Sequence, residues 1–93
     1  MEHENLRFCK SLAGHDKGTV YIIIKEENDY VYVVDGKYKK LQAPKRKNVK
    51  HIECVSSIYN VFENVNIPNG KLRDEDIRKA IKLFKFKLKT EVD

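Results

Sequence analysis

Seven positively charged side chains fall between residues 37 and 50, and no acidic residue lies among them. Lys and Arg clusters of this kind attract phosphate oxygens and release the counterions condensed on a nucleic-acid backbone. The sequence therefore predicts phosphate contacts from Lys37, Lys39, Lys40, Lys45, Arg46, Lys47 and Lys50. A solvated basic loop without a partner is the alternative. His51, next along the chain, is either a further phosphate contact or a hydrogen-bonded structural residue.

A glycine-containing loop is the second candidate site. Gly14 and Gly18 enclose three polar residues and lead into an apolar, β-branched run at 20–24. Glycine permits positive φ and close approach of another backbone, so the loop can present N–H groups and charge to phosphate. The candidate contacts are Gly14, His15, Lys17 and Gly18. Asp16 opposes this role, and we expect it to brace the loop; the alternative is a plain hairpin turn.

Other chemistries find little support in the sequence. Tyr38 lies among lysines and is either a stacking platform for a base or a core residue. The cysteines and histidines lack the CxxC and HxxxH spacings of zinc sites, and no Ser-His-Asp arrangement or phosphate-cradling motif is present. We therefore expect no metal, no cofactor, no small-molecule substrate and no enzymatic activity.

The charge is distributed unevenly along the chain. Residues 1–36 carry a balance of −3, whereas residues 37–93 carry +8, and the isoelectric point is about 9.2. Positive charge confined to one part of a chain favours a polyanionic partner. Ninety-three residues make one domain, 1–93, with one modest core and no room for a deep catalytic cavity.

The expected cellular compartment follows from three features: the apolar segments, the first residues and the cysteines. No stretch approaches the apolar length of a membrane span, and the first residues do not have the pattern of a signal peptide. Cys9 and Cys54 are far apart in the chain and are expected to be buried thiols in a reducing compartment. These features predict a cytoplasmic protein that does not bind membranes.

Hydrophobic patterning predicts five short strands, at 6–12, 20–25, 30–34, 38–41 and 51–55. The glycine loop at 13–18, an acidic turn at 26–29, a tight Asp35-Gly36 hairpin and a loop at 42–50 join them. Strands this short, linked this tightly, favour a small closed or half-open β-barrel over about 6–55.

The C-terminal part predicts a helix. After a linker at 56–72, three carboxylates open a segment at 74–88, where they suit the positive end of the helix dipole. One apolar stripe then follows helical spacing: Ile77, Ala80, Ile81, Phe84 and Leu88. We expect this helix to pack on the barrel and to turn Lys79, Lys82, Lys85 and Lys89 toward solvent.

The same residues resemble a known motif. The run Ala13–Gly18, followed by the apolar block at 21–24 and by Asp29–Gly36, is similar to a KOW motif of ribosomal and transcription-elongation proteins. The segments Lys45–Glu53 and Asp74–Ile81 extend this resemblance to the "L fourteen e" ribosomal proteins and their small bacterial KOW relatives. The segment 56–70 matches poorly. Arg73 stands where those relatives carry a Ser or Thr helix cap, so Asp74 is expected to cap instead.

The resemblance implies a mainly β, SH3-like small barrel of the KOW type with a C-terminal α-helix. It also implies a protein that binds structured RNA, in particular ribosomal RNA, without catalysis, and that contacts ribosomal proteins. Phosphate contacts position a protein but carry little sequence information, so recognition is expected to follow RNA shape. The alternative is an SH3-like protein-interaction module in transcription or translation, which would need an aromatic groove.

Overall fold

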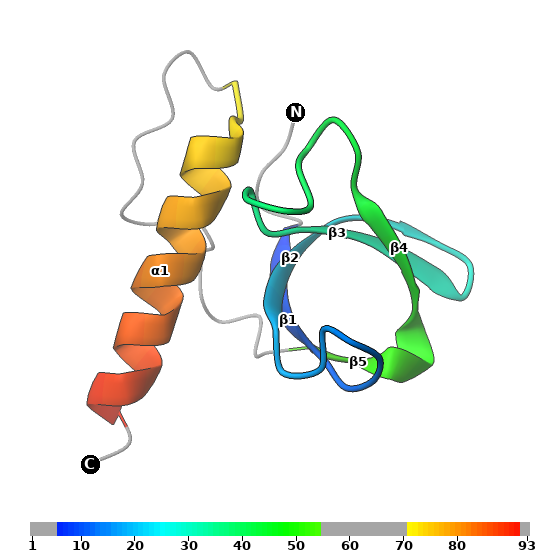
Figure 1. Ribbon diagram of the computed structural model, residues 1–93, viewed down its shortest axis with the longest axis horizontal. Coiled ribbons are helices and arrows are strands. Elements are labelled where there is room, and N and C mark those ends of the chain that lie inside the picture. Colours follow the sequence, from blue (N-terminus) through cyan, green and yellow to red (C-terminus); the bar gives the residue numbers. More distant parts are fainter. Residues whose placement is uncertain (1–5, 55–70, 92–93) are drawn as a thin grey trace.

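Five strands, one short 3-10 helix and one α-helix are the regular elements of the part of the chain that the computed structural model describes, residues 6–54 and 71–91 (Figure 1). The elements are β1 (Arg7–Ser11), β2 (Val20–Glu27), β3 (Tyr30–Val34), β4 (Lys45–Asn48), the 3-10 helix η2 (Val49–His51), β5 (Ile52–Cys54) and α1 (Asp74–Glu91). The prediction of a mainly β fold with a C-terminal helix is confirmed. The predicted linker 56–72 lies outside the described residues except for its last two positions.

The strands form a single antiparallel sheet in the order β4-β3-β2-β1-β5. Figure 1 shows the sheet curled into an arc, with η2 joining β4 to β5. An irregularity in the pairing of β2 with β3, between Ile23 and Lys25, adds to this curl because a bulge bends its strand. β4 and β5 do not pair in the described residues, so the sheet is not closed into a barrel.

β2 is the central strand of the sheet, and its first half is buried on both faces, whereas its last three residues are exposed. Ile22 faces α1, whereas Tyr21 and Ile23 face the inside of the curl, and all three are almost fully buried. This is the environment that a continuous apolar, β-branched run favours. The inner cluster also contains Cys9, Val31 and Val33.

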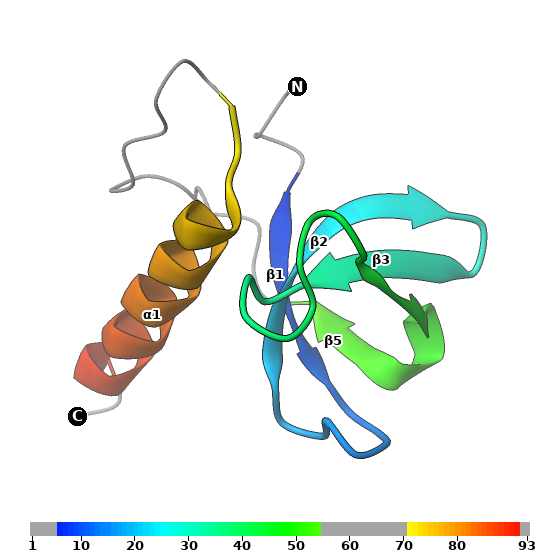
Figure 2. The same ribbon diagram turned by 45° about the horizontal axis from the view of Figure 1, so that its top comes forward.

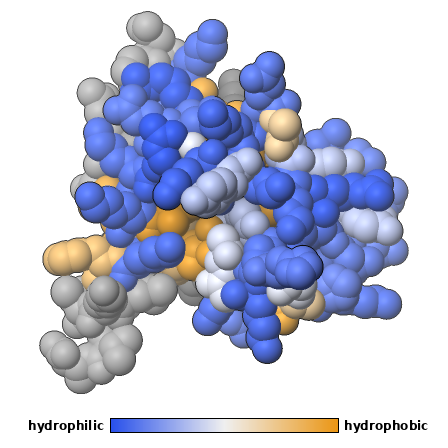
Figure 3. All heavy atoms as spheres, viewed as in Figure 1, coloured by the Kyte–Doolittle hydropathy of each residue, from blue (hydrophilic) through white to orange (hydrophobic). Residues whose placement is uncertain are grey.

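Helix α1 packs against the outer face of the curled sheet (Figure 2). The predicted stripe is confirmed at Ile77, Ala80, Ile81 and Phe84; the side chain of Leu88 lies outside the described residues. Phe84 stacks on Phe8 of β1, with ring centroids 4.1 Å apart and planes 14° from parallel. On the face drawn in Figure 3, hydrophobic surface lies between helix and sheet, with hydrophilic residues around it.

The start of α1 differs from the expected cap. The carboxylate of Asp76 accepts the backbone N–H of Arg73 at 3.0 Å, and the Arg73 guanidinium donates two bonds back to it. This reproduces the half of a capping box that a third-position acid supplies. Asp74 instead accepts the backbone N–H of Leu41 at 2.8 Å, so it ties the loop between β3 and β4 to the start of the helix.

Two predicted turns and one predicted strand are wrong. The 26–29 turn shortens to Asn28-Asp29, because Asn28 adopts a left-handed conformation and Glu26 and Glu27 continue β2. The region 38–41 is not a strand, and β4 forms instead at Lys45–Asn48, inside the predicted loop. Asp35 causes this difference: its side chain holds the following residues in a compact loop rather than a two-residue hairpin.

The two cysteines have opposite environments, although they face each other in the β1–β5 register. Cys9 is fully buried, and burial, with a smaller effect of Cys54, raises its pKa to about 12. Cys54 is exposed, so the expectation of a buried thiol holds for Cys9 and is wrong for Cys54. Across residues 6–54 and 71–91, α1 has neither the length of apolar sequence nor the composition of a membrane-crossing helix.

Candidate nucleic-acid interface

Asp16 is the most heavily bonded side chain of the glycine loop. Its carboxylate accepts the Ser11 hydroxyl at 2.8 Å and the Tyr21 hydroxyl at 2.7 Å, from β1 and β2. From β4 it accepts the ammonium groups of Lys45 at 2.8 Å and Lys47 at 2.9 Å. We call these five residues the Asp16 cluster. Because β4 is not a neighbour of β1 or β2, the cluster joins the two sides of the curl through side chains.

The electrostatics of the Asp16 cluster follow from this bonding. Burial alone would raise the pKa of Asp16, but the hydrogen bonds from Lys45, Tyr21, Lys47 and Ser11 outweigh it and hold that pKa well below its usual range. Burial and the bond to Asp16 raise the pKa of the Tyr21 hydroxyl. Asp16 is therefore an anion fixed by two lysines. The expected bracing role of Asp16 is confirmed.

An open groove of about 550 Å³ lies beside the Asp16 cluster. Its walls are the glycine loop and start of β2, the loop after β3, one residue of β4, and α1. Five cationic side chains line it against two carboxylates: Lys37, Lys39, Lys45, Arg78 and Lys85 against Asp16 and Asp35. Both carboxylates are already occupied by hydrogen-bond donors, so the groove presents positive charge.

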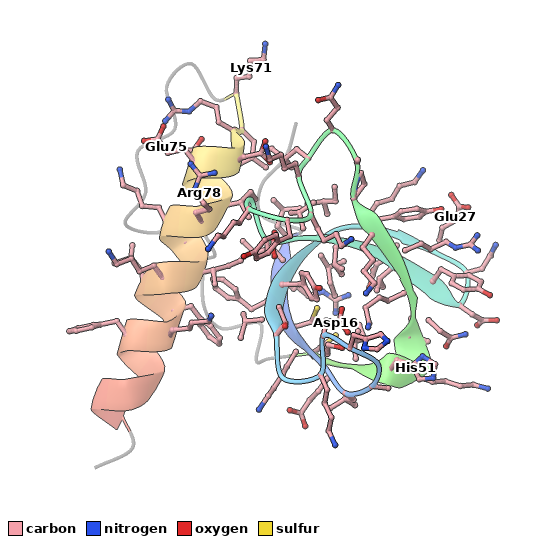
Figure 4. The ribbon with its side chains drawn as sticks, viewed as in Figure 1. Asp16, Glu27, His51, Lys71, Glu75 and Arg78 are labelled. Atoms are coloured by element: carbon pink, nitrogen blue, oxygen red, sulfur yellow. The ribbon has the colours of Figure 1, made fainter. Side chains whose placement is uncertain are left out.

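The loop at 35–39 is held rigidly in this groove. One oxygen of Asp35 accepts the backbone N–H groups of Lys37, Tyr38 and Lys39 at 2.8–2.9 Å. Arg78 of α1 donates to the Gly36 carbonyl at 2.6 Å (Figure 4). Gly36 has φ +78° and packs so closely on α1 that an added Cβ would lie 2.4 Å from the Asp74 carbonyl. The helix therefore fixes where the cations of this loop stand.

The structure gathers part of the predicted phosphate-binding set around the groove. His15, Lys37, Lys39 and Lys45 line it, so the glycine loop and the basic segment share one face. Tyr38, for which the sequence left two roles open, lines it with 76% of its surface exposed and is not a core residue. Lys45 keeps about a third of its side chain exposed while it bonds Asp16.

Other predicted contacts lie elsewhere. The Lys47 side chain is only 7% exposed and is committed to Asp16, so it is not available to an outside phosphate. The guanidinium of Arg46 sits 4.5 Å from the Tyr30 ring centroid. Lys50 and His51 are exposed in η2. They lie next to the start of the glycine loop, where the Leu12 N–H donates to the His51 carbonyl (Figure 4). The remaining predicted contacts are exposed and do not line the groove: Gly14, Lys17, Gly18 and Lys40.

Sequence reasoning missed the contribution of the helix. Arg78 and Lys85 are seven residues apart, two helical turns, and flank the Ile81 position of the apolar stripe. That spacing places both cations along one border of the buried face, where they meet whatever the helix packs on. The spacing of the two cations can be read from the sequence. Which loops of the sheet they face could be known only from the way the helix packs on the sheet.

Within the described ranges, no group of three or more His, Cys, Asp or Glu side chains is arranged to hold a metal ion. No protein-family model matches the chain, and no curated protein matches it.

Proposed function

We propose that this protein binds structured RNA, with the groove between the glycine loop, the 35–39 loop and α1 as its contact surface. The observation that carries the proposal is the convergence of five cations from three separate segments on one concave surface. Phosphate oxygens are the ligands that such a surface suits, because clustered Lys and Arg neutralise them and release counterions.

Four of these cations can contact phosphate, Arg78 through the guanidinium N–H groups that it does not donate to the Gly36 carbonyl. Lys37, Lys39, Arg78 and Lys85 have no carboxylate partner among residues 6–54 and 71–91, whereas Lys45 is paired with Asp16. The contacts are held by different elements at fixed separations, so they favour a backbone of particular shape over a particular sequence. Binding requires no catalysis, and we propose no enzymatic activity.

A protein-interaction module is the competing proposal. It requires several aromatic side chains along one groove. Here Tyr21 is buried and hydrogen-bonded to Asp16, and Tyr38 is the exposed aromatic among the groove residues. A groove with one exposed aromatic side chain and five cationic side chains favours RNA over a protein partner.

The finer identity is also a proposal. Strands β1 to β4 form a meander, and β5 then pairs with β1 after the 3-10 helix. This topology supports an SH3-like arrangement of the KOW type, although β4 and β5 do not pair in the described residues. With the motif resemblance, it supports a role on ribosomal RNA, next to ribosomal proteins, in the cytoplasm.

The salt dependence of RNA binding tests the proposal. Because about four phosphates are neutralised, log affinity for a structured RNA should fall with log salt concentration at a slope of about −3. Fluorescence anisotropy of a labelled RNA hairpin between 50 and 300 mM KCl measures this slope. No binding at the lowest salt, or binding that does not respond to salt, would contradict the proposal and favour a protein partner.

A further inference from the structure

Tyr38 combines high exposure with a rigid backbone. Its side chain is 76% exposed, the largest value among the exposed large hydrophobic residues of the described chain. An exposed ring on a mobile loop would not be held in one position for a ligand. Here, however, the Tyr38 N–H is one of three that bond Asp35, and the loop ends are joined because the Asp35 and Gly36 N–H groups donate to the Lys39 carbonyl. The ring is therefore displayed by a preordered loop.

The surroundings of the ring are cationic. The Lys37 ammonium lies 5.1 Å from the Tyr38 ring centroid, and the groove below carries Lys39, Arg78 and Lys85. The Lys37 ammonium lies over one face of the ring, so a nucleobase can stack on the other face, with its flanking phosphates beside the cations of the groove. The groove volume of about 550 Å³ is in the range that holds small ligands, so it has room for one unpaired nucleotide.

We propose that Tyr38 is a stacking platform for one unpaired base, and that the preferred ligand is RNA with a bulged or looped nucleotide rather than a continuous duplex. This inference rests on the proposed function and specifies its ligand. In a continuous A-form helix the bases are stacked on each other and hidden from side chains, whereas an unpaired base can leave the stack and lie on an aromatic ring. The cations then bind the phosphates that flank it.

Two RNA duplexes of the same sequence, one perfect and one with a single bulged nucleotide, test the proposal. Each is titrated by fluorescence anisotropy with the full chain and with Tyr38→Ala and Tyr38→Phe. The wild type should prefer the bulged RNA roughly ten- to a hundredfold, which is the range expected for one stacked base. Tyr38→Ala should lose this preference and still bind the perfect duplex, and Tyr38→Phe should keep it, because the ring and not the hydroxyl stacks.

Tyr30→Ala is the matched control, since Tyr30 is another exposed tyrosine but does not line the groove. It should leave the preference intact. A wild type that binds both RNAs equally, or a Tyr38→Ala variant that keeps the preference, overturns the stacking proposal and leaves RNA binding itself standing. A wild type that binds neither RNA at low salt overturns the proposed function, and the stacking proposal with it. Circular dichroism confirms that each variant is folded.

Discussion

Replacing Asp16 by Asn is expected to lower the free energy of unfolding by about 3 kcal/mol at pH 7, more than an ordinary surface change. The substitution keeps the shape of the side chain, so it leaves no cavity. It removes the charge that neutralises Lys47, whose side chain is 7% exposed, and a buried ammonium without a counter-charge is strongly destabilising. Urea denaturation followed by circular dichroism measures the change.

Asp29→Asn is the matched control, because Asp29 is an exposed acid in the β2–β3 turn; it should change stability by less than about 0.5 kcal/mol. A second variant separates the charge from other effects. Adding Lys47→Met to Asp16→Asn should recover part of the lost stability, because the unpaired ammonium is removed together with its need for a partner. Equal stabilities for Asp16→Asn and the control would contradict the bracing role of the Asp16 cluster.

The difference in the free energy of unfolding between the wild type and Asp16→Asn is expected to depend on pH. The hydrogen bonds to Asp16 hold its folded-state pKa below the value of about 3.9 that an unfolded Asp has. Its stabilising contribution is therefore fully present above that value and is lost as pH falls toward the folded pKa. The stability gap between wild type and Asp16→Asn should narrow from pH 5 to pH 2. A gap that stays constant over this range would show that the carboxylate charge is not responsible.

Removing two groove cations should have the largest effect on binding. Lys37→Gln with Lys85→Gln withdraws one exposed cation from the 35–39 loop and one from α1. Affinity for a structured RNA should fall roughly a hundredfold at moderate salt, and the salt slope should become shallower by about 1.5, because two of about four phosphate contacts are lost.

Lys10→Gln with Lys82→Gln makes the same change of charge at exposed positions of β1 and α1 outside the groove. This control should bind within about twofold of the wild type, since surface charges away from the contact act only through a screened field. Equal losses from the two double variants would mean that net charge, and not the groove, determines the affinity.

The sequence predicted the elements whose hydrophobic pattern is strong. The block at 20–24 and the run at 30–34 became β2 and β3, and the stripe from Ile77 to Phe84 became the packed face of α1. β4 could not be predicted in this way, because Lys45–Asn48 has no apolar alternation. Its inward position is occupied by Lys47, and the partner that makes this tolerable, Asp16, is 31 residues away.

The candidate site was predicted only in part, because its assembly also depends on contacts between residues far apart in the sequence. The basic segment and the glycine loop were recognised as separate features, and their meeting on one face follows from sheet register and the Asp16 cluster. The exposure of Tyr38 depends on hydrogen bonds to Asp35, and the role of Arg78 depends on the docking of α1 on Gly36. Local sequence carries the residue types, whereas their convergence is a property of tertiary contacts.

The most direct test of the account is a map of the RNA contact on the protein by amide chemical shifts. ¹⁵N-labelled protein titrated with a bulged RNA should show its largest shifts at 15–19, at 35–39 and between Arg78 and Lys85, the three segments that line the groove. Amides of the β2–β3 turn at 27–30 should hardly move. Shifts concentrated at that turn, with the groove amides unchanged, would contradict the claim that these cations act together on RNA.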